Sequence, residues 1–145
     1  MRLARVLALA ALAMVFAGCP RHGGTKTATS NANDQTAKEE AAIENDLKKE
    51  KFEARDWLQD SSHEVFKMGG RERFAKMADT YYEIGAKEVW MTRCSKHEQT
   101  TFAGAMVVVL PTSKDERKEF FEKANEKSPG EFEDKGEKYI ILDLD

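Results

Sequence analysis

The N-terminal nineteen residues constrain this chain more than any other feature of the sequence. Residues 6–17 are twelve uninterrupted apolar residues, preceded by Arg2 and Arg5, and small residues stand directly before Cys19. This pattern is typical of a signal peptide. As a helix the apolar run would extend about 18 Å, whereas the hydrocarbon core of a membrane is about 30 Å thick. The run is therefore too short to span a membrane, and we expect residues 1–18 to be removed.

The residues Phe16-Ala17-Gly18-Cys19 resemble the lipobox of bacterial lipoproteins, and the resemblance is confined to residues 1–19. It implies cleavage after Gly18 and acylation of Cys19, which places the domain at a cell membrane or outer membrane, facing the periplasm or the exterior. Two or more acyl chains anchor a protein stably because each buried methylene contributes about 0.8 kcal/mol. The alternative is an ordinary secretory signal that leaves Cys19 as a free thiol.

The aromatic residues beyond the signal peptide indicate where the folded domain lies. All twelve aromatic residues beyond position 19 lie between Phe52 and Tyr139. Residues 20–36 hold no large apolar side chain and cannot bury enough surface to fold. Residues 37–58 are rich in Ala, Glu and Lys and predict a helix. We therefore expect a signal peptide over 1–18, a lipid anchor with a flexible to helical tether over 19–45, and one domain over 46–145.

Apolar periodicity predicts the elements of that domain. Helical segments show apolar residues three and four apart, whereas strands alternate or run without a polar break. In chain order we expect a helix over 71–84, a half-buried strand over 87–93, a central strand over 102–110, a helix opened by a capping box at 113–116, and a strand over 138–144.

This element order predicts an α+β fold, in which two helices cover one side of a mixed sheet as a small two-layer sandwich. The two middle strands pair as a hairpin, and the second helix crosses over to a parallel final strand. If residues 64–66 add a strand before the first helix, the order becomes ferredoxin-like. Such sandwiches host many unrelated functions, so the fold alone names none.

One cluster of side chains suggests chemistry. Cys94 is the only cysteine besides Cys19, and Arg93, Lys96 and His97 stand close to it in sequence. Positive neighbours lower the pKa of a thiol, which would let Cys94 act with His97 as a nucleophile or redox group. A nucleophile also needs a cleft and a third residue, and a structural zinc site needs four ligands. We expect a passive Cys94, with thiol chemistry, an intermolecular disulfide or metal binding as alternatives.

The other polar features predict no cofactor and no metal site. The amides at Gly69-Gly70 could receive an anion, but a turn and helix cap is the simpler interpretation. His63 is expected in a loop without a partner. Acidic residues late in the chain could offer oxygens to calcium, but their spacing departs from that of an EF-hand loop and predicts a solvated acidic rim. They are Glu131, Glu133, Asp134, Glu137, Asp143 and Asp145.

Charge and motifs together limit the function. The chain has 23 Lys and Arg against 26 Asp and Glu, which gives no basic field, so we expect no nucleic-acid partner. An anchored domain without catalytic motifs predicts a non-enzymatic interaction module of the cell envelope that binds a protein partner. The alternative is a thiol-dependent or redox accessory protein that uses Cys94 and His97.

Overall fold

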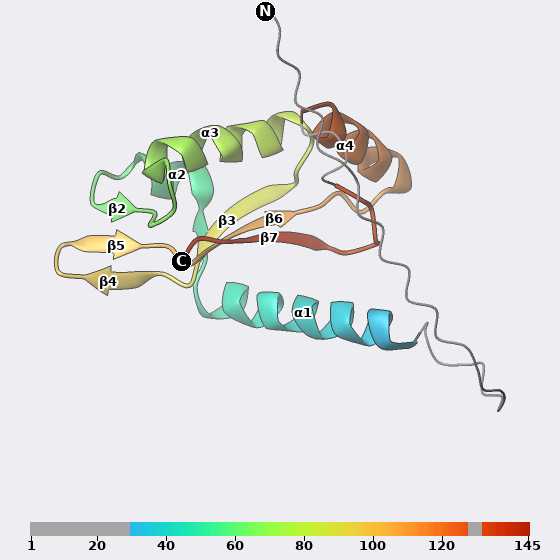
Figure 1. Cartoon of the computed structure of the whole chain (residues 1–145), viewed down its shortest axis with the longest axis horizontal. Coiled ribbons are helices and arrows are strands. Elements are labelled where there is room, and N and C mark those ends of the chain that lie inside the picture. Colours follow the sequence, from blue (N-terminus) through green and yellow to red (C-terminus); the bar gives the residue numbers. More distant parts are fainter. Residues whose placement is uncertain (1–29, 128–131) are drawn as a thin grey trace, which may run out of the picture.

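The computed structural model of the chain describes residues 30–127 and 132–145 (Figure 1). The predicted signal peptide over 1–18 and the predicted lipidation site Cys19 lie outside these ranges. The helices and strands, in chain order, are α1 (Ser30–Lys49), β1 (Phe52–Glu53), α2 (Ala54–Gln59), β2 (His63–Glu64), α3 (Gly70–Glu83), β3 (Glu88–Thr92), β4 (Ser95–His97), β5 (Thr100–Phe102), β6 (Ala105–Val109), α4 (Lys114–Lys127) and β7 (Tyr139–Asp143).

The main sheet of the described chain has four antiparallel strands in the order β1-β3-β6-β7. Side chains alternate between its two faces, as in any strand. On one face Val89 and Met91 of β3 lie beside Met106 and Val108 of β6, all fully buried in the main core. The predicted α+β class is confirmed, and so are the helix predicted over 71–84 and the strands predicted over 87–93 and 138–144.

The final strand runs antiparallel to β6, so the predicted parallel crossover is wrong. Tyr139 lies opposite Val109, where β6 ends. The chain returns from α4 to that same end of β6 through residues 132–138. This return segment is fixed to α4, because the Arg117 guanidinium donates to the Glu137 carbonyl at 2.8 Å and the Asn125 amide donates to the Phe132 carbonyl at 2.8 Å. β7 therefore enters the sheet beside the residue at which β6 leaves it.

The described chain also has a second sheet of three strands, in the order β2-β5-β4. This sheet is mixed, because β2 is parallel to β5 and β4 is antiparallel to it. The strand predicted near residues 64–66 is thus present as β2, but it pairs with β5. It does not join the main sheet, so the ferredoxin-like arrangement is not formed.

A single bent hairpin links the two sheets. Its register continues through the bend, because Thr92 pairs with Ala105 and Ser95 with Phe102. At the bend Arg93 adopts a positive φ of 53°, and the Gly104 amide donates to the Arg93 carbonyl at 3.1 Å. A Cβ on Gly104 would lie 2.9 Å from that carbonyl oxygen, so the close approach requires glycine.

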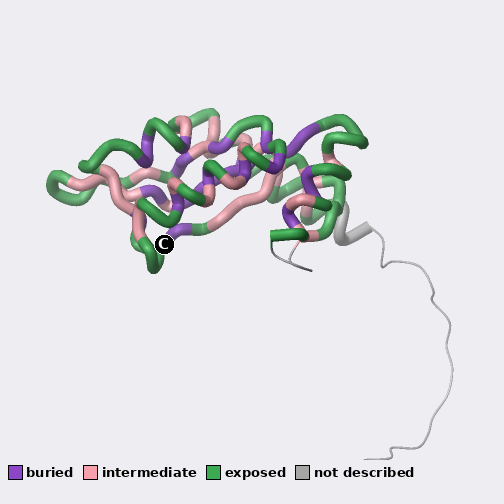
Figure 2. The backbone as a smooth tube through the Cα atoms, turned by 90° about the horizontal axis from the view of Figure 1, so that it is seen from above, coloured by how far each residue is buried: buried purple, intermediate pink, exposed green. Residues whose placement is uncertain are grey.

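Helices lie on both faces of the main sheet (Figure 1). α2 and α3 cover the face of Val89 and Met91, and α1 crosses the other face, where Ile43 is 6% exposed. The sequence did not predict this additional layer, in which packing begins before residue 46. Figure 2 shows the buried segments in the middle of the body, whereas the far end of the hairpin is exposed.

The helix predicted over 37–58 is interrupted in the structure. The Thr92 hydroxyl donates to the Glu50 carbonyl at 2.7 Å, just after α1 ends. Phe52 then pairs with Met91 as part of β1, and α2 begins at Ala54. Tertiary contacts with β3 therefore override the helix propensity of this segment.

Candidate functional site

Cys94 lies at the bend of the hairpin and is partly buried against the core. Its backbone amide donates to the Glu50 carboxylate at 3.1 Å. Burial and, to a smaller extent, the nearby Glu50 charge together raise the pKa of the Cys94 thiol to about 11. A thiol with this pKa is protonated at neutral pH, which is the opposite of what thiol chemistry requires.

Of the positive neighbours expected to activate Cys94, Arg93 is bound to carboxylates, and Lys96 and His97 are exposed. Arg93 binds Asp46 at 2.8 Å and Asp143 at 2.9 Å, and these carboxylates raise its pKa. His97 is exposed on β4. Over residues 30–127 and 132–145, no three His, Cys, Asp or Glu side chains are grouped so that they could hold a metal ion.

The late acidic residues that the structure describes include partners of arginines. Asp134 and Glu137 both lie beside Arg117 on α4, and Asp143 binds Arg93 across the sheet. The Arg117 hydrogen bond lowers the pKa of Asp134. Asp134 and Asp143 are exposed, as the solvated rim predicts, whereas Glu137 is partly buried; all three also pair with arginines, which the sequence did not predict.

The N-terminus of α3 already has an anion, supplied by the protein itself. One Glu64 carboxylate oxygen accepts from the Val65 and Arg71 amides, both at 3.0 Å. These hydrogen bonds lower the pKa of Glu64. Gly69 and Gly70 form the turn with φ values of 95° and 52°, as the simpler interpretation predicted.

His63 has close partners, contrary to the expectation of a free loop residue. Its ring stacks on Trp57 with centroids 4.4 Å apart, and its Nδ1 donates to the Trp57 carbonyl at 2.8 Å. Trp57 is buried in the core, so His63 is a structural residue that joins β2 to α2.

An exposed apolar surface lies between β2 and α3. Phe66 is 66% exposed and Met68 is 87% exposed. The Phe66 ring stacks on Phe102 of β5, with centroids 4.0 Å apart and an angle of 11° between the rings. We call Phe66, Met68 and Phe102 the apolar tip. Large apolar side chains at this exposure are unusual enough to mark a contact surface when they lie together.

The backbone holds the apolar tip outward. Val65 is buried at one side of Phe66, and the Glu64 carboxylate joins Val65 to the start of α3. The Arg73 guanidinium donates to the Met68 carbonyl at 3.0 Å. These contacts fix the backbone on both sides of Phe66 and Met68, whose side chains are exposed.

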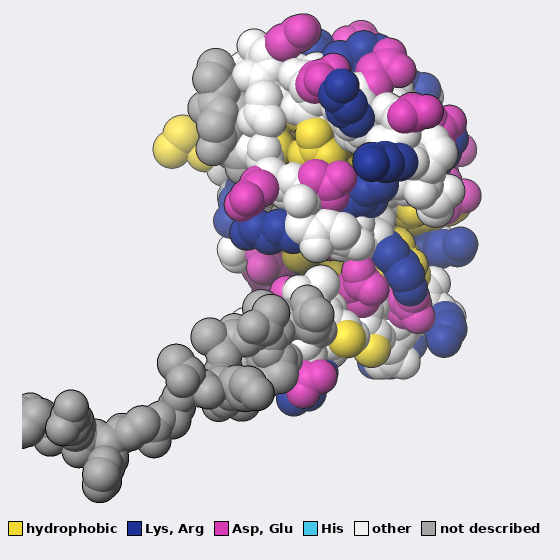
Figure 3. All heavy atoms as spheres, turned by 90° about the vertical axis from the view of Figure 1, so that its right-hand side faces the viewer, with side chains coloured by type: hydrophobic (Ala, Val, Ile, Leu, Met, Phe, Trp, Pro, Cys, Tyr) yellow, Lys and Arg dark blue, Asp and Glu magenta, His cyan; other side chains and the backbone are white. Residues whose placement is uncertain are grey.

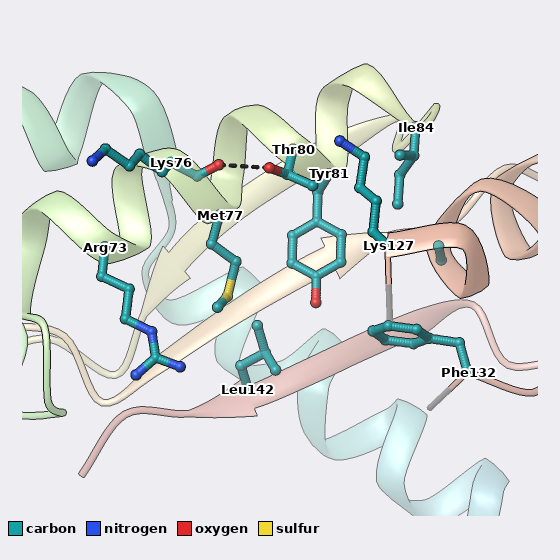
Figure 4. A pocket seen from close by; sticks show the side chains of 10 residues that line it. Arg73, Lys76, Met77, Thr80, Tyr81, Ile84, Lys127, Phe132 and Leu142 are labelled. Atoms are coloured by element: carbon teal, nitrogen blue, oxygen red, sulfur yellow. Dashed lines mark hydrogen bonds between the residues drawn. The ribbon is translucent and has the colours of Figure 1, made fainter. Parts of the chain in front are cut away.

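A second feature is a cleft of about 370 Å³ between α3, α4 and β7 (Figure 4). Apolar side chains form most of its wall, and Arg73, Lys76 and Lys127 stand at its border. The apolar residues are Met77, Tyr81, Ile84, Ala124, Phe132 and Leu142. Met77, Tyr81 and Leu142 point toward one another in Figure 4, and the Arg73 guanidinium lies at one end.

Charged side chains of both signs are interspersed on the face drawn in Figure 3. Within the described ranges, no helix combines the length and the apolar character needed to cross a bilayer. Comparisons with known proteins identify no relative: no family model matches the chain, and no match is found among curated proteins or solved structures.

Proposed function

We propose that this protein is a lipid-anchored protein of the bacterial cell envelope whose α+β domain is a non-enzymatic interaction module. The resemblance of residues 16–19 to a lipobox supports the anchor at Cys19. The apolar tip supports the interaction, and it is the observation that carries this proposal. The raised pKa of Cys94 argues against the thiol-dependent alternative.

The occupant proposed for the apolar tip is a protein with an apolar pocket. Aromatic residues and methionine are enriched in the cores of protein interfaces, where they supply much of the binding energy. Phe66 is already ordered by its stacking on Phe102, so binding would cost little side-chain entropy. Lys67, between Phe66 and Met68, has no ion pair with any residue of the described ranges, which favours a partner with acidic residues around its pocket.

Site-specific photo-cross-linking of the full chain in its own envelope tests this proposal. A photoreactive residue at position 67 should give one discrete protein adduct, and the same residue at Lys118, exposed on α4, should give none. Phe66→Ser should reduce the adduct about tenfold or more, because truncating a central aromatic residue removes most of an interface's affinity. Adducts with lipid alone, or a protein adduct that survives Phe66→Ser, would contradict protein docking at the tip.

A further inference from the structure

The cleft between α3, α4 and β7 is separate from the apolar tip, and we infer that it binds an elongated apolar molecule that ends in a carboxylate. The simplest member of this class is a medium-chain fatty acid. The cleft holds about 370 Å³, within the range of roughly 300 to 1,000 Å³ typical of small-molecule sites. Its wall is mostly apolar, which suits a hydrocarbon body.

Arg73 carries the argument for the carboxylate. Its stem packs on the Gly69 backbone so closely that a Cβ on Gly69 would lie 2.6 Å from the Arg73 Cδ. One guanidinium nitrogen donates to the Met68 carbonyl, and no carboxylate of residues 30–127 or 132–145 forms an ion pair with Arg73. An arginine has five N–H donors arranged as a planar fork that fits a carboxylate. Arg73 is therefore held in place with donors left for an anion.

The other cations at the border are less suited to this role. Lys127 binds Glu83 at 3.4 Å, so its charge is already countered. The Lys76 side chain runs along α3, away from Leu142, in Figure 4. Among the residues that the structure describes, no Asp or Glu lines the cleft. The charge distribution therefore places the anionic head at Arg73 and the apolar body over Met77 and Leu142.

Titration with decanoate, below the concentration at which it forms micelles, tests this inference. The protein is the full chain with Cys19→Ser, so that no acyl group of its own competes. Decanoate should bind saturably, and decanol about tenfold more weakly, because a charge-assisted hydrogen bond is worth one to two decades in affinity. Arg73→Gln should lower the affinity for decanoate to that for decanol. Arg73→Lys should bind decanoate with an affinity between those of Arg73→Gln and the parent.

Two further variants locate the site. Leu142→Phe, which adds side-chain volume inside the cleft, should lower the affinity for both decanoate and decanol. Arg55→Gln on α2 should bind decanoate with the same affinity as the parent. Thermal unfolding of each variant shows that it is folded before titration. Absence of saturable decanoate binding, equal affinity for decanol, or unchanged binding in Arg73→Gln or Leu142→Phe would overturn the inference. Arg73 also donates to the Met68 carbonyl of the apolar tip, so Leu142→Phe, which keeps that hydrogen bond, distinguishes a loss of the cleft from a change at the tip.

Discussion

Three arginines of this protein show how surroundings decide what one residue type does. Arg93 and Arg117 each bind two carboxylates, and their pKa values are raised as a result. They join segments that are distant in sequence. Arg73 is exposed, and its described partners are a carbonyl and an aromatic ring rather than a carboxylate. This difference separates a structural arginine from one that is available to a ligand.

At Glu64 we predict a pH-dependent contribution to stability. Its folded-state pKa is lowered, so the ionised form stabilises the native state above the unfolded pKa of about 4.3, and that stability is lost as pH falls through the folded pKa. Glu64→Gln should cost about 1 kcal/mol at pH 7, as loss of a helix cap does, and much less at pH 3. Urea unfolding at both pH values measures this. Glu122→Gln on α4 is the control, and an equal cost for Glu64→Gln at both pH values would refute the capping role.

We predict that the Cys94 thiol reacts slowly with alkylating reagents in the native protein. A pKa near 11, against the ordinary value of 9.0, leaves about a hundredfold less thiolate at pH 8. Alkylation of native Cys19→Ser protein should therefore be much slower than alkylation of the same protein in denaturant, and its rate should still rise above pH 9. Glu50→Gln should speed the native reaction by removing the nearby charge. A rate that levels off below pH 8 would reinstate the thiol-dependent alternative.

Among the elements, the sequence predicted local burial and the hairpin of β3 and β6, but it did not predict the direction of β7 or the second sheet. α3, β3 and β7 repeat their apolar residues with the period of a helix or strand, because one face of each meets the core. β4 and β5 are three residues each and mostly polar, so they carry no such pattern. The direction of β7 depends on the route of the return segment, which Arg117 and Asn125 determine through contacts distant in sequence.

At the hairpin bend we predict that Gly104→Ala is strongly destabilising. The added Cβ would meet the Arg93 carbonyl oxygen at 2.9 Å and the Arg93 Cβ at 3.0 Å, and neither atom belongs to a flexible side-chain end. Overpacking of this kind costs about 1 to 3 kcal/mol. Urea denaturation gives the value directly. A change below about 0.5 kcal/mol, the usual scatter of surface substitutions, would mean that the bend moves freely.

For α1 we predict that docking on the sheet is part of the native fold. Ile43 is buried on the sheet, and Asp46 binds Arg93 from the same helix. Ile43→Ala should destabilise the domain by about 2 to 4 kcal/mol, in the range for buried aliphatic residues. Ala41→Ser, at an exposed position of α1, is the matched control. Equal midpoints of thermal unfolding for the two variants would show that α1 belongs to the tether instead.

For the molecule as a whole, the sequence indicated that the aromatic core lies beyond residue 46, but it did not indicate that Ile43 of α1 packs on the sheet or which surface the domain offers. Phe66 and Met68 have the apolar character of core residues, but in the structure Val65 is buried and these two side chains are exposed. The cleft joins side chains from α3, β7 and the return segment, so no local pattern could reveal it. The proposed anchor, in contrast, is predicted entirely from the sequence of residues 1–19.

The proposed location depends on the chemistry of Cys19, and intact-mass spectrometry of the protein from membranes of its native host measures that chemistry directly. We predict a chain that begins at Cys19 and carries a diacylglyceryl group, with or without a further N-acyl chain. A mutant with Cys19→Ser should lose the added mass and leave the membrane fraction. A chain found with residues 1–18 still attached, or with an unmodified Cys19 thiol, would contradict the account.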